Sequence, residues 1–261
     1  MLVDIEKKKL QIFFDDHVKK LIFVCSHERS GTHFLMNSIA YNSNYTVKPF
    51  LDFDYYQLGS IINFHKADHV SNFIKKISSI EKNNIKYRLS SLIKSHHPAY
   101  IFQNLFNDDD IIFYYIYRHP TETLLSYWKF INHWDWHEGP KKKDPTSFAK
   151  SAPEGQMQRY QQKSYDSIFS RWANHVSEWL ECSNKFKNIH FIHYEDLNKD
   201  YYNTMEKVLN IAKLPSKNIT RPPKDNFVKI NEIFLSDNES KKFKEYIKSS
   251  LYYYPSLKNI L

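Results

Sequence analysis

The sequence is poor in cysteine and glycine, and it has no long apolar run. Its two cysteines, Cys25 and Cys182, form no C-x-x-C pair and cannot build a disulfide framework, which predicts a protein of a reducing compartment. No segment approaches the roughly 20 apolar residues of a membrane-spanning helix. The charged N-terminal residues do not resemble a signal peptide. We therefore expect a cytoplasmic protein without a membrane span.

The remaining composition favours an ordinary globular protein. Hydrophobic residues make up 41% of the 261 residues and aromatic residues 16%, which is too apolar for a disordered chain. The length fits one α/β domain, so we expect residues 1–261 to form a single domain. Because the chain has only 4 glycines, a glycine inside a motif needs a structural reason.

The net charge of +8 suits an acidic ligand such as a nucleotide, a sulfated or phosphorylated sugar, or nucleic acid. Abundant lysine is the simpler explanation of most of this charge. No nucleic-acid-binding motif is present and the basic residues are spread along the chain, so no nucleic-acid partner is expected. Basic residues at defined motif positions need a separate explanation.

Strand-like and helix-like segments alternate along the chain. Short apolar segments followed by polar residues or proline predict strands at 20–25, 91–95, 111–117 and 188–193. The unbroken run IIFYYIY at 111–117 is typical of a parallel strand buried on both faces. Helices are expected over 31–41, 120–132, 164–181, 201–213 and 239–250. We predict an α/β fold with a central, mostly parallel sheet flanked by helices.

Two stretches do not fit this alternation. Residues 42–88 are interpreted as an insertion with a helix around 71–80. Residues 132–163 lack periodicity, and loops of this length are usually lids or binding loops. Trp134 and Trp136 in this loop suit stacking on a sugar or an aromatic acceptor, and packing in the core is an equally good interpretation.

The most informative segment is KLIFVCSHERSGTHFL at 20–35. A strand runs into a polar turn and then into a helix, which directs backbone N–H groups and the positive helix end at one point. Gly31 lets the backbone approach an anion. Ser30 and Thr32 offer hydroxyl groups, and Arg29 adds a positive charge. We therefore predict a P-loop-like, phosphate-binding turn.

This turn differs from the nucleoside-triphosphate loop G-x-x-x-x-G-K-[ST]. Cys25 and Ser26 stand where the first glycine would be, and Ser30-Gly31-Thr32 replaces Gly-Lys-Thr. The chain thus lacks the lysine that such a loop places on a γ-phosphate. A P-loop nucleotide or small-molecule kinase, which would require ATP and Mg²⁺, is kept as the alternative enzyme.

A second motif, LIKSHHP at 92–98, ends a predicted strand. Lys94 and His96 are two residues apart, so their side chains lie on one face. That end of a parallel sheet is where α/β proteins bind ligands. His96 suits a general base, and Lys94 can stabilise developing negative charge. His97, on the opposite face, ranks second as the base.

A third motif, YRHPTETLLSYWKF at 117–130, joins a strand end to a helix. Arg118 closes the strand, and Ser126 lies within the following helix. A guanidinium and a hydroxyl in these places can clamp a second phosphate. A surface arginine in a salt bridge is the alternative interpretation.

A fourth segment, 191–215, begins with a strand that ends at Tyr194. Asp196 suits the cap of the helix that follows. Glu195 and Asp196 also suit charged partners for Arg118 or Lys94.

Together the four segments resemble the sulfotransferases that use the donor PAPS (3′-phosphoadenosine 5′-phosphosulfate), over roughly residues 20–215. That family's phosphosulfate loop usually has the pattern P-[KR]-S-G-T-T-W, and its strand-end histidine lies in K-[TS]-H-x-P. Its 3′-phosphate site pairs a strand-end arginine with a serine eight residues later, and a Y-E-D-L element follows. The matching positions here are 28–34, 94–98, Arg118 with Ser126, and 194–197.

The resemblance implies in-line transfer of a sulfuryl group from PAPS to a hydroxyl or amine, without a metal. It implies that His96 removes the acceptor's proton, that Lys94 stabilises the sulfuryl oxygens and that Arg29 stabilises the leaving phosphate. The donor-binding residues that it implies are Arg29, Ser30, Gly31, Thr32, His33, Phe34, Arg118, Ser126 and Tyr194. Phe34 can stack on adenine, as the usual tryptophan does.

The chain also departs from the family pattern. Glu28 stands where proline is usual, and His33 replaces a threonine. The R-K-G segment that binds the 3′-phosphate in cytosolic members is absent. Arg221, Lys224 or Lys229 can substitute for it, and the sequence does not choose among them.

The acceptor stays open, because fold-level resemblance does not identify substrates. Small-molecule, carbohydrate, lipid and tyrosyl-peptide acceptors all fit, and the oligomeric state is also open. The pairs His65-x₃-His69 and His133-x₃-His137 have metal-ligand spacing, but with 13 histidines such pairs arise by chance, so no metal is expected. A nucleotide- or glycan-binding protein without turnover is disfavoured, since Lys94 and His96 are both present.

Overall fold

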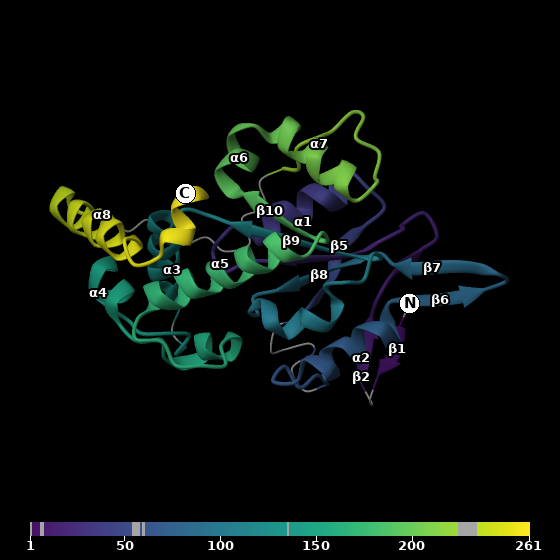
Figure 1. Cartoon of the computed structure of the whole chain (residues 1–261), viewed down its shortest axis with the longest axis horizontal. Helices are drawn as coiled ribbons and strands as arrows, with labels where there is room; N and C mark the ends of the chain where they lie inside the picture. Colours follow the sequence, from purple (N-terminus) through teal and green to yellow (C-terminus); the bar gives the residue numbers. More distant parts are fainter. Residues whose placement is uncertain (1, 6–7, 54–57, 59–60, 135, 224–233) are drawn as a thin grey trace.

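Five parallel strands form the centre of the structure (Figure 1). The computed structural model describes residues 2–5, 8–53, 58, 61–134, 136–223 and 234–261. The strands follow the order β10-β9-β4-β8-β5, and each neighbouring pair is parallel. Their bounds are β4 Leu21–Cys25, β5 Thr46–Asp52, β8 Ser91–Ser95, β9 Ile111–Tyr117 and β10 Ile189–His193. The predicted α/β fold with a central parallel sheet is confirmed.

Helices cover both faces of this sheet (Figure 1). Those on one face are α2 Ala67–Ile77, η1 Ala99–Leu105 and α5 Ile168–Lys185, and those on the other are α1 Thr32–Tyr41 and α7 Tyr201–Ile211. In β9, Phe113 and Tyr115 pack with the first group, whereas Ile112 and Tyr114 pack with the second. Alternate side chains of a strand point to opposite faces. The unbroken apolar run of β9 therefore serves two cores.

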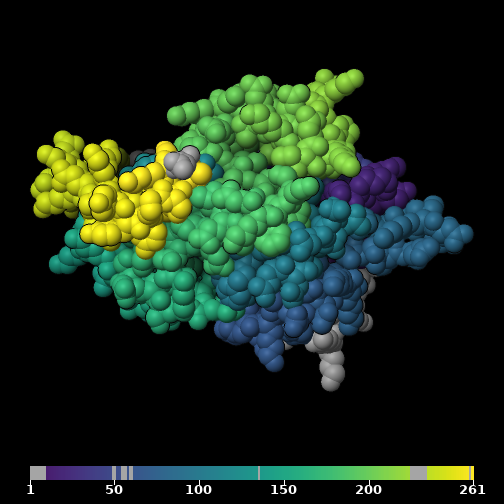
Figure 2. Space-filling view, viewed as in Figure 1, coloured from purple at the N-terminus to yellow at the C-terminus, as the bar shows by residue number. Residues whose placement is uncertain are grey.

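Smaller elements flank the central sheet. At one end the β6–β7 hairpin protrudes, and at the other lie α3, α4 and α8 (Figure 1). Figure 2 shows the C-terminal residues, in yellow, lying over that second end of the molecule. The bounds are β1 Leu2–Ile5, β2 Lys8–Gln11, β3 Phe14–Asp15, β6 Ser79–Lys82, β7 Ile85–Leu89, α3 Pro120–His133, α4 Pro145–Lys150, η2 Gly155–Tyr160, α6 Tyr194–Lys199, α8 Asp237–Leu251 and η3 Pro255–Asn259. None of the described helices is long and apolar enough to cross a bilayer.

Residues 42–88 are more than an insertion around one helix. They contribute the strand β5 to the sheet, then α2 and the β6–β7 hairpin. Pro49 lies inside β5 and weakens its strand pattern, because proline donates no ladder hydrogen bond. The strand tolerates Pro49 since it lies at the edge of the sheet.

Two local predictions need correction. Helix α5 begins at Ile168 rather than at 164, because the Ser167 and Ser170 side chains form a capping box there. Asp196 does not cap the helix that follows it. It lies in the first turn of the short helix α6, and the N-cap residue of α7 is Asp200.

Candidate active site

A cavity of about 530 Å³ opens at the carboxyl ends of β4, β8 and β9. The predicted residues that line it are Arg29, Gly31, Thr32, His33, Phe34, Lys94, His96, Arg118, Ser126 and Tyr194. Ser30 is buried in the same turn. Because parallel strands end at one edge of a sheet, the four sequence segments meet here.

The turn between β4 and α1 has the backbone of an anion-binding loop. Arg29 and Gly31 have φ angles of 66° and 99°, and Gly31 is the N-cap residue of α1. A Cβ atom at Gly31 would lie 2.3 Å from Cδ2 of Tyr194, so only glycine fits against that ring. The Ser30 hydroxyl is buried and has no hydrogen-bond partner among the described residues. The N-terminus of α1 therefore meets a buried hydroxyl that still needs a partner.

Two arginines bring positive charge to this turn. Arg29 donates from Nε to Ser126 Oγ (3.2 Å), and its guanidinium lies 4.8 Å from the centre of the Phe130 ring. Burial, and then the nearby charge of Arg118, lower the pKa of Arg29. Arg118 lies over the Tyr194 ring (4.6 Å) and 3.4 Å from a Glu122 carboxylate oxygen, and its Nε is buried without a hydrogen-bond partner among the described residues. Two neighbouring guanidinium groups favour an anion between them.

His96 is held by the loop that precedes the turn. Its Nδ1 lies 2.9 Å from the backbone oxygen of Ser26 and 3.2 Å from the Ser26 hydroxyl. A carbonyl oxygen only accepts, so Nδ1 carries the proton and the lone pair of the neutral ring is on Nε2. This tautomer suits a general base.

The side chains on either side of His96 differ in their surroundings. Lys94 lies in the same cavity, where its ammonium group is 3.1 Å from Asp52 of β5. His97 is turned away, as the alternation predicted: its Nε2 is 3.1 Å from the Phe53 carbonyl, and its ring stacks on Phe64 at 4.3 Å. The geometry therefore favours His96 over His97 as a base.

A buried ion pair lies beneath the turn, and the sequence analysis missed it. Arg171 of α5 donates from Nη2 to Glu28 Oε1 (2.7 Å) and from Nη1 to Glu28 Oε2 (3.0 Å). Tyr127 also donates to Glu28 Oε1 (3.0 Å). The charge of Arg171 holds the pKa of Glu28 well below its usual range, against the effect of burial. These hydrogen bonds hold Glu28, the residue before Arg29, to Tyr127 of α3 and to Arg171 of α5.

Two histidines extend this buried cluster. His27 accepts from Arg171 Nη1 (2.8 Å), and burial lowers the pKa of His27 to about 4. His175 accepts from the Tyr115 hydroxyl (2.8 Å) and donates from Nε2 to the His96 carbonyl (3.1 Å). The cluster therefore connects the phosphate turn to the backbone of the candidate base. Its signal in the sequence is two polar residues, Arg171 and His175, on the otherwise apolar face of α5.

The fourth segment makes other contacts than predicted. Glu195 lies 2.8 Å from His193 Nε2 and accepts from the backbone N–H of His119, and Asp196 lies 3.7 Å from His193. Arg118 and Lys94 pair with Glu122 and Asp52 instead. Tyr194 is the residue of this segment that reaches the cavity.

Of the three C-terminal basic candidates, Lys224 and Lys229 lie outside the described residues. Arg221 lies 5.2 Å from the centres of the Phe34 and Tyr201 rings and donates to Asn198 Oδ1 at 2.8 Å. This position is next to Phe34, which lines the cavity.

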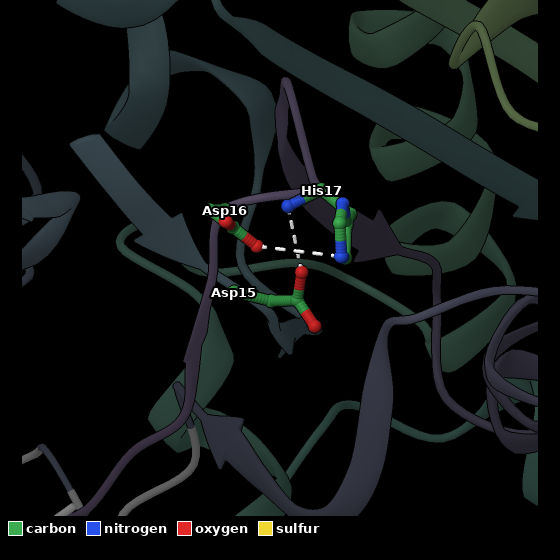
Figure 3. Close-up of side chains that lie close together, drawn as sticks. All are labelled: Asp15, Asp16 and His17. Atoms are coloured by element: carbon green, nitrogen blue, oxygen red, sulfur yellow. Dashed lines mark hydrogen bonds and ion pairs between the residues drawn. The ribbon is translucent and has the colours of Figure 1, made fainter. Parts of the chain in front are cut away.

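One group of three potential metal ligands occurs among the described residues, namely Asp15, Asp16 and His17. Figure 3 shows Asp15 accepting from the backbone N–H of His17 (2.7 Å), and Asp16 lies 3.5 Å from the His17 ring. These local contacts account for the group, and we assign no metal to it. One of the histidine pairs with metal-ligand spacing is His65 and His69. In the structure His69 Nδ1 accepts a hydrogen bond from the backbone N–H of Asn63 (2.6 Å).

Comparison with known proteins identifies the family to which the chain belongs. A family model described as the sulfotransferase domain matches residues 19–250. The chain belongs to that family. It is 27% identical to the amine sulfotransferase of Oryctolagus cuniculus over 154 residues, which cover 58% of this chain and 45% of the relative. It is 26% identical to the 3-alpha-hydroxysteroid sulfotransferase of Cavia porcellus over 152 residues, 57% of this chain and 47% of that one. The matched region thus spans less than half the length of these curated relatives.

A solved structure shares the fold of this chain. Retinol dehydratase in complex with retinol and PAP has a TM-score of 0.54 and 13% sequence identity, over 90% of this chain and 82% of that one. At that identity the likeness concerns the fold alone. Within the family pattern, this chain has Glu28, paired with Arg171, at the position where proline is usual.

Proposed function

We propose that this chain transfers a sulfuryl group from PAPS to a hydroxyl or amine of a small acceptor. The observation that carries the proposal is the meeting of an anion-binding turn, two arginines and a correctly oriented histidine in one cavity. Membership of the sulfotransferase family supports the reaction class, and the PAP held by retinol dehydratase supports the donor.

The cavity at the strand ends, here the donor cavity, fits a doubly phosphorylated nucleotide. The Ser30 hydroxyl and Arg118 Nε are buried groups whose hydrogen bonds are unmet among the described residues, and phosphate oxygens would satisfy them. Ser126 accepts from Arg29, which leaves its own hydroxyl proton to donate to a phosphate. We assign the 5′-phosphosulfate to the turn at 29–33 and the 3′-phosphate to Arg118 and Ser126.

The protein's own groups then have distinct roles. PAPS supplies a sulfuryl group that is already activated by its bond to phosphate. His96 takes the acceptor's proton at Nε2, because the Ser26 carbonyl holds the other ring proton at Nδ1. Lys94 stabilises negative charge on the sulfuryl oxygens, and Arg29 stabilises charge on the departing phosphate. Phe34 and Tyr194 offer aromatic surface for the adenine.

Calorimetric titration with PAP tests the donor site. We expect micromolar binding to the wild-type protein and clearly weaker binding to Arg118→Ala, since Arg118 supplies charge and an unmet donor to the site. ATP with Mg²⁺ serves as the comparison ligand. Binding of ATP–Mg²⁺ in the absence of PAP binding would contradict the proposal and favour a kinase.

A further inference from the structure

A second cavity, of about 380 Å³, adjoins the donor cavity. Its walls come from residues 61–69 and 159–162, together with His97. Arg159 lines both cavities. The Tyr160 ring lies 5.4 Å from the ring of His96 and 5.4 Å from the ring of His97. His97 lines the second cavity, whereas His96 and Tyr160 line the donor cavity, so the two cavities meet at Arg159 and near the Tyr160 ring.

Hydrogen-bonding side chains dominate the wall of the second cavity. Ile61, Ile62 and Phe64 are its apolar lining residues, and the others carry amide, imidazole or guanidinium groups. Gln161 is the most informative of these, because its Oε1 is buried and has no hydrogen-bond partner in the part of the chain that the structure describes. A buried acceptor oxygen without a donor is unfavourable, and a hydroxyl group of a ligand would satisfy it.

From Arg159, which both cavities share, polar contacts lead through Glu138 of the donor cavity to an exposed tryptophan nearby. Arg159 Nη1 lies 2.8 Å from Glu138 Oε1, and Glu138 Oε2 accepts from Trp136 Nε1 (3.3 Å). The Trp136 side chain is 47% exposed and stacks on Trp134 at 4.2 Å. An aromatic face beside hydrogen-bonding groups matches a sugar ring, which presents C–H groups on its face and hydroxyls on its edge.

We propose that the second cavity binds the acceptor and that this acceptor is a carbohydrate. The inference rests on the proposed sulfuryl transfer and adds its substrate class. A phenol or a steroid would place mainly apolar surface against this wall, whereas a sugar presents a hydroxyl donor to Gln161 Oε1, and pockets for apolar ligands are lined predominantly by apolar side chains. The transfer forms a sulfur–oxygen bond to the sugar and breaks the bond from sulfur to the donor's phosphate. The reacting hydroxyl extends from the second cavity past Arg159 into the donor cavity, where its proton moves to His96.

The test uses the full chain with PAPS and a panel of disaccharides (lactose, cellobiose and N,N′-diacetylchitobiose), with 2-naphthol as the apolar comparison. Turnover is followed as PAP release, and saturation-transfer NMR on the PAP-saturated protein reports binding without turnover. We expect at least one disaccharide to bind and to be sulfated. Gln161→Leu should raise the KM for that sugar about tenfold, the effect of losing one buried hydrogen bond. Gln103→Leu, at an exposed position on η1, is the matched control and should leave it unchanged.

The outcomes separate the two proposals. If PAP does not bind, the proposed function fails and this inference fails with it. If PAP binds but no disaccharide binds or reacts, the carbohydrate inference is overturned while the donor site stands, whether or not 2-naphthol is sulfated. Equal KM values for Gln161→Leu and Gln103→Leu would overturn the assignment of the second cavity. Unchanged PAP affinity in Gln161→Leu shows that this variant is folded.

Discussion

His96 owes its proposed role to one hydrogen bond. Because the Ser26 carbonyl accepts from Nδ1 (2.9 Å), the ring presents Nε2 as its basic nitrogen. Ser26 belongs to the same loop as the turn at 29–33, so the loop proposed to bind the donor also orients the proposed base. The neighbouring His97 has the same chemistry but packs against Phe64.

Replacing His96 with alanine should lower turnover by roughly 10²-fold or more, the usual loss when a general base is removed. PAP affinity should fall far less than turnover, because His96 Nδ1 contacts Ser26, which precedes the residues assigned to the phosphates. Steady-state kinetics and calorimetry with PAP measure the two quantities. His17→Ala, at an exposed position, is the matched control and should keep full turnover. Near-normal turnover in His96→Ala would exclude His96 as the base.

Glu28, which stands where the family usually has proline, forms a buried ion pair with Arg171. Where proline would stiffen the loop through its ring, this chain uses a carboxylate held by two guanidinium hydrogen bonds and by Tyr127. The fixed backbone matters because the next residue, Arg29, has a φ of 66°, which is unfavourable for a side chain larger than hydrogen. The ion pair thus stabilises a turn that its own sequence does not favour.

Replacing only one residue of the Glu28–Arg171 pair should strongly lower the stability of the protein. Glu28→Gln or Arg171→Met should each lower the free energy of unfolding by about 3–5 kcal/mol, because the remaining partner stays buried and unpaired. The double variant should lose clearly less than the sum of the two, since it buries no lone charge. Urea unfolding measures all three variants. Additive losses would show that the two residues act independently and that the pair does not hold the turn.

At the scale of elements, helix α5 has two tasks. Its apolar face, with Ile168, Trp172, Val176 and Trp179, packs on the sheet, and Arg171 projects from the same face into the cluster under the turn. The start of α5 is therefore important for the site as well as for the core. The capping box of Ser167 and Ser170 sets that start.

Removing the cap should weaken this helix measurably. Ser167→Ala should lower the free energy of unfolding by about 1 kcal/mol, because the backbone N–H of Ser170 loses its acceptor. Ser164→Ala, three residues earlier and exposed, is the matched control and should have little effect. Urea unfolding at neutral pH distinguishes them. An equal loss in both variants would place the start of the helix before Ser167.

At the scale of the whole molecule, the buried histidines tie stability to pH. Burial lowers the pKa of His27 to about 4, whereas an unfolded histidine has the ordinary value of 6.5. Between these values the unfolded chain binds a proton that the folded protein excludes, so stability rises with pH across this window. The lowered pKa values of His175 and Glu28 act in the same direction.

Stability should therefore be complete above about pH 6.5 and should fall as the pH drops toward 4, by about 3 kcal/mol for His27 alone. Urea unfolding at a series of pH values from about 8 down to about 5 covers the upper part of this window. In His27→Gln the slope against pH should become shallower, because that position no longer titrates. A slope that His27→Gln leaves unchanged would contradict the role given to this residue.

Much of the fold was predictable because its signals are local. The strands at 91–95 and 111–117 have the bounds that their apolar runs predict, and the helices after the phosphate turn and after Tyr117 begin within one residue of the expected place. Strand β5 was missed because Pro49 weakens its pattern and its edge position depends on the rest of the sheet. The lengths of α4 and η2 were too short for periodicity to reveal.

The sequence by itself determined the α/β architecture, the strand–turn–helix segment at 20–35 and the family, because each depends on residues that are neighbours in the chain. Only the tertiary structure decided which side chains meet. Arg171 lies 143 residues from Glu28, and Gln161 and Trp136 belong to a stretch without periodicity. Such contacts arise when parallel strands bring their carboxyl ends to one edge and the loops between them pack together. No local sequence pattern predicts these contacts, because the partners are far apart in the chain and meet only in the folded structure.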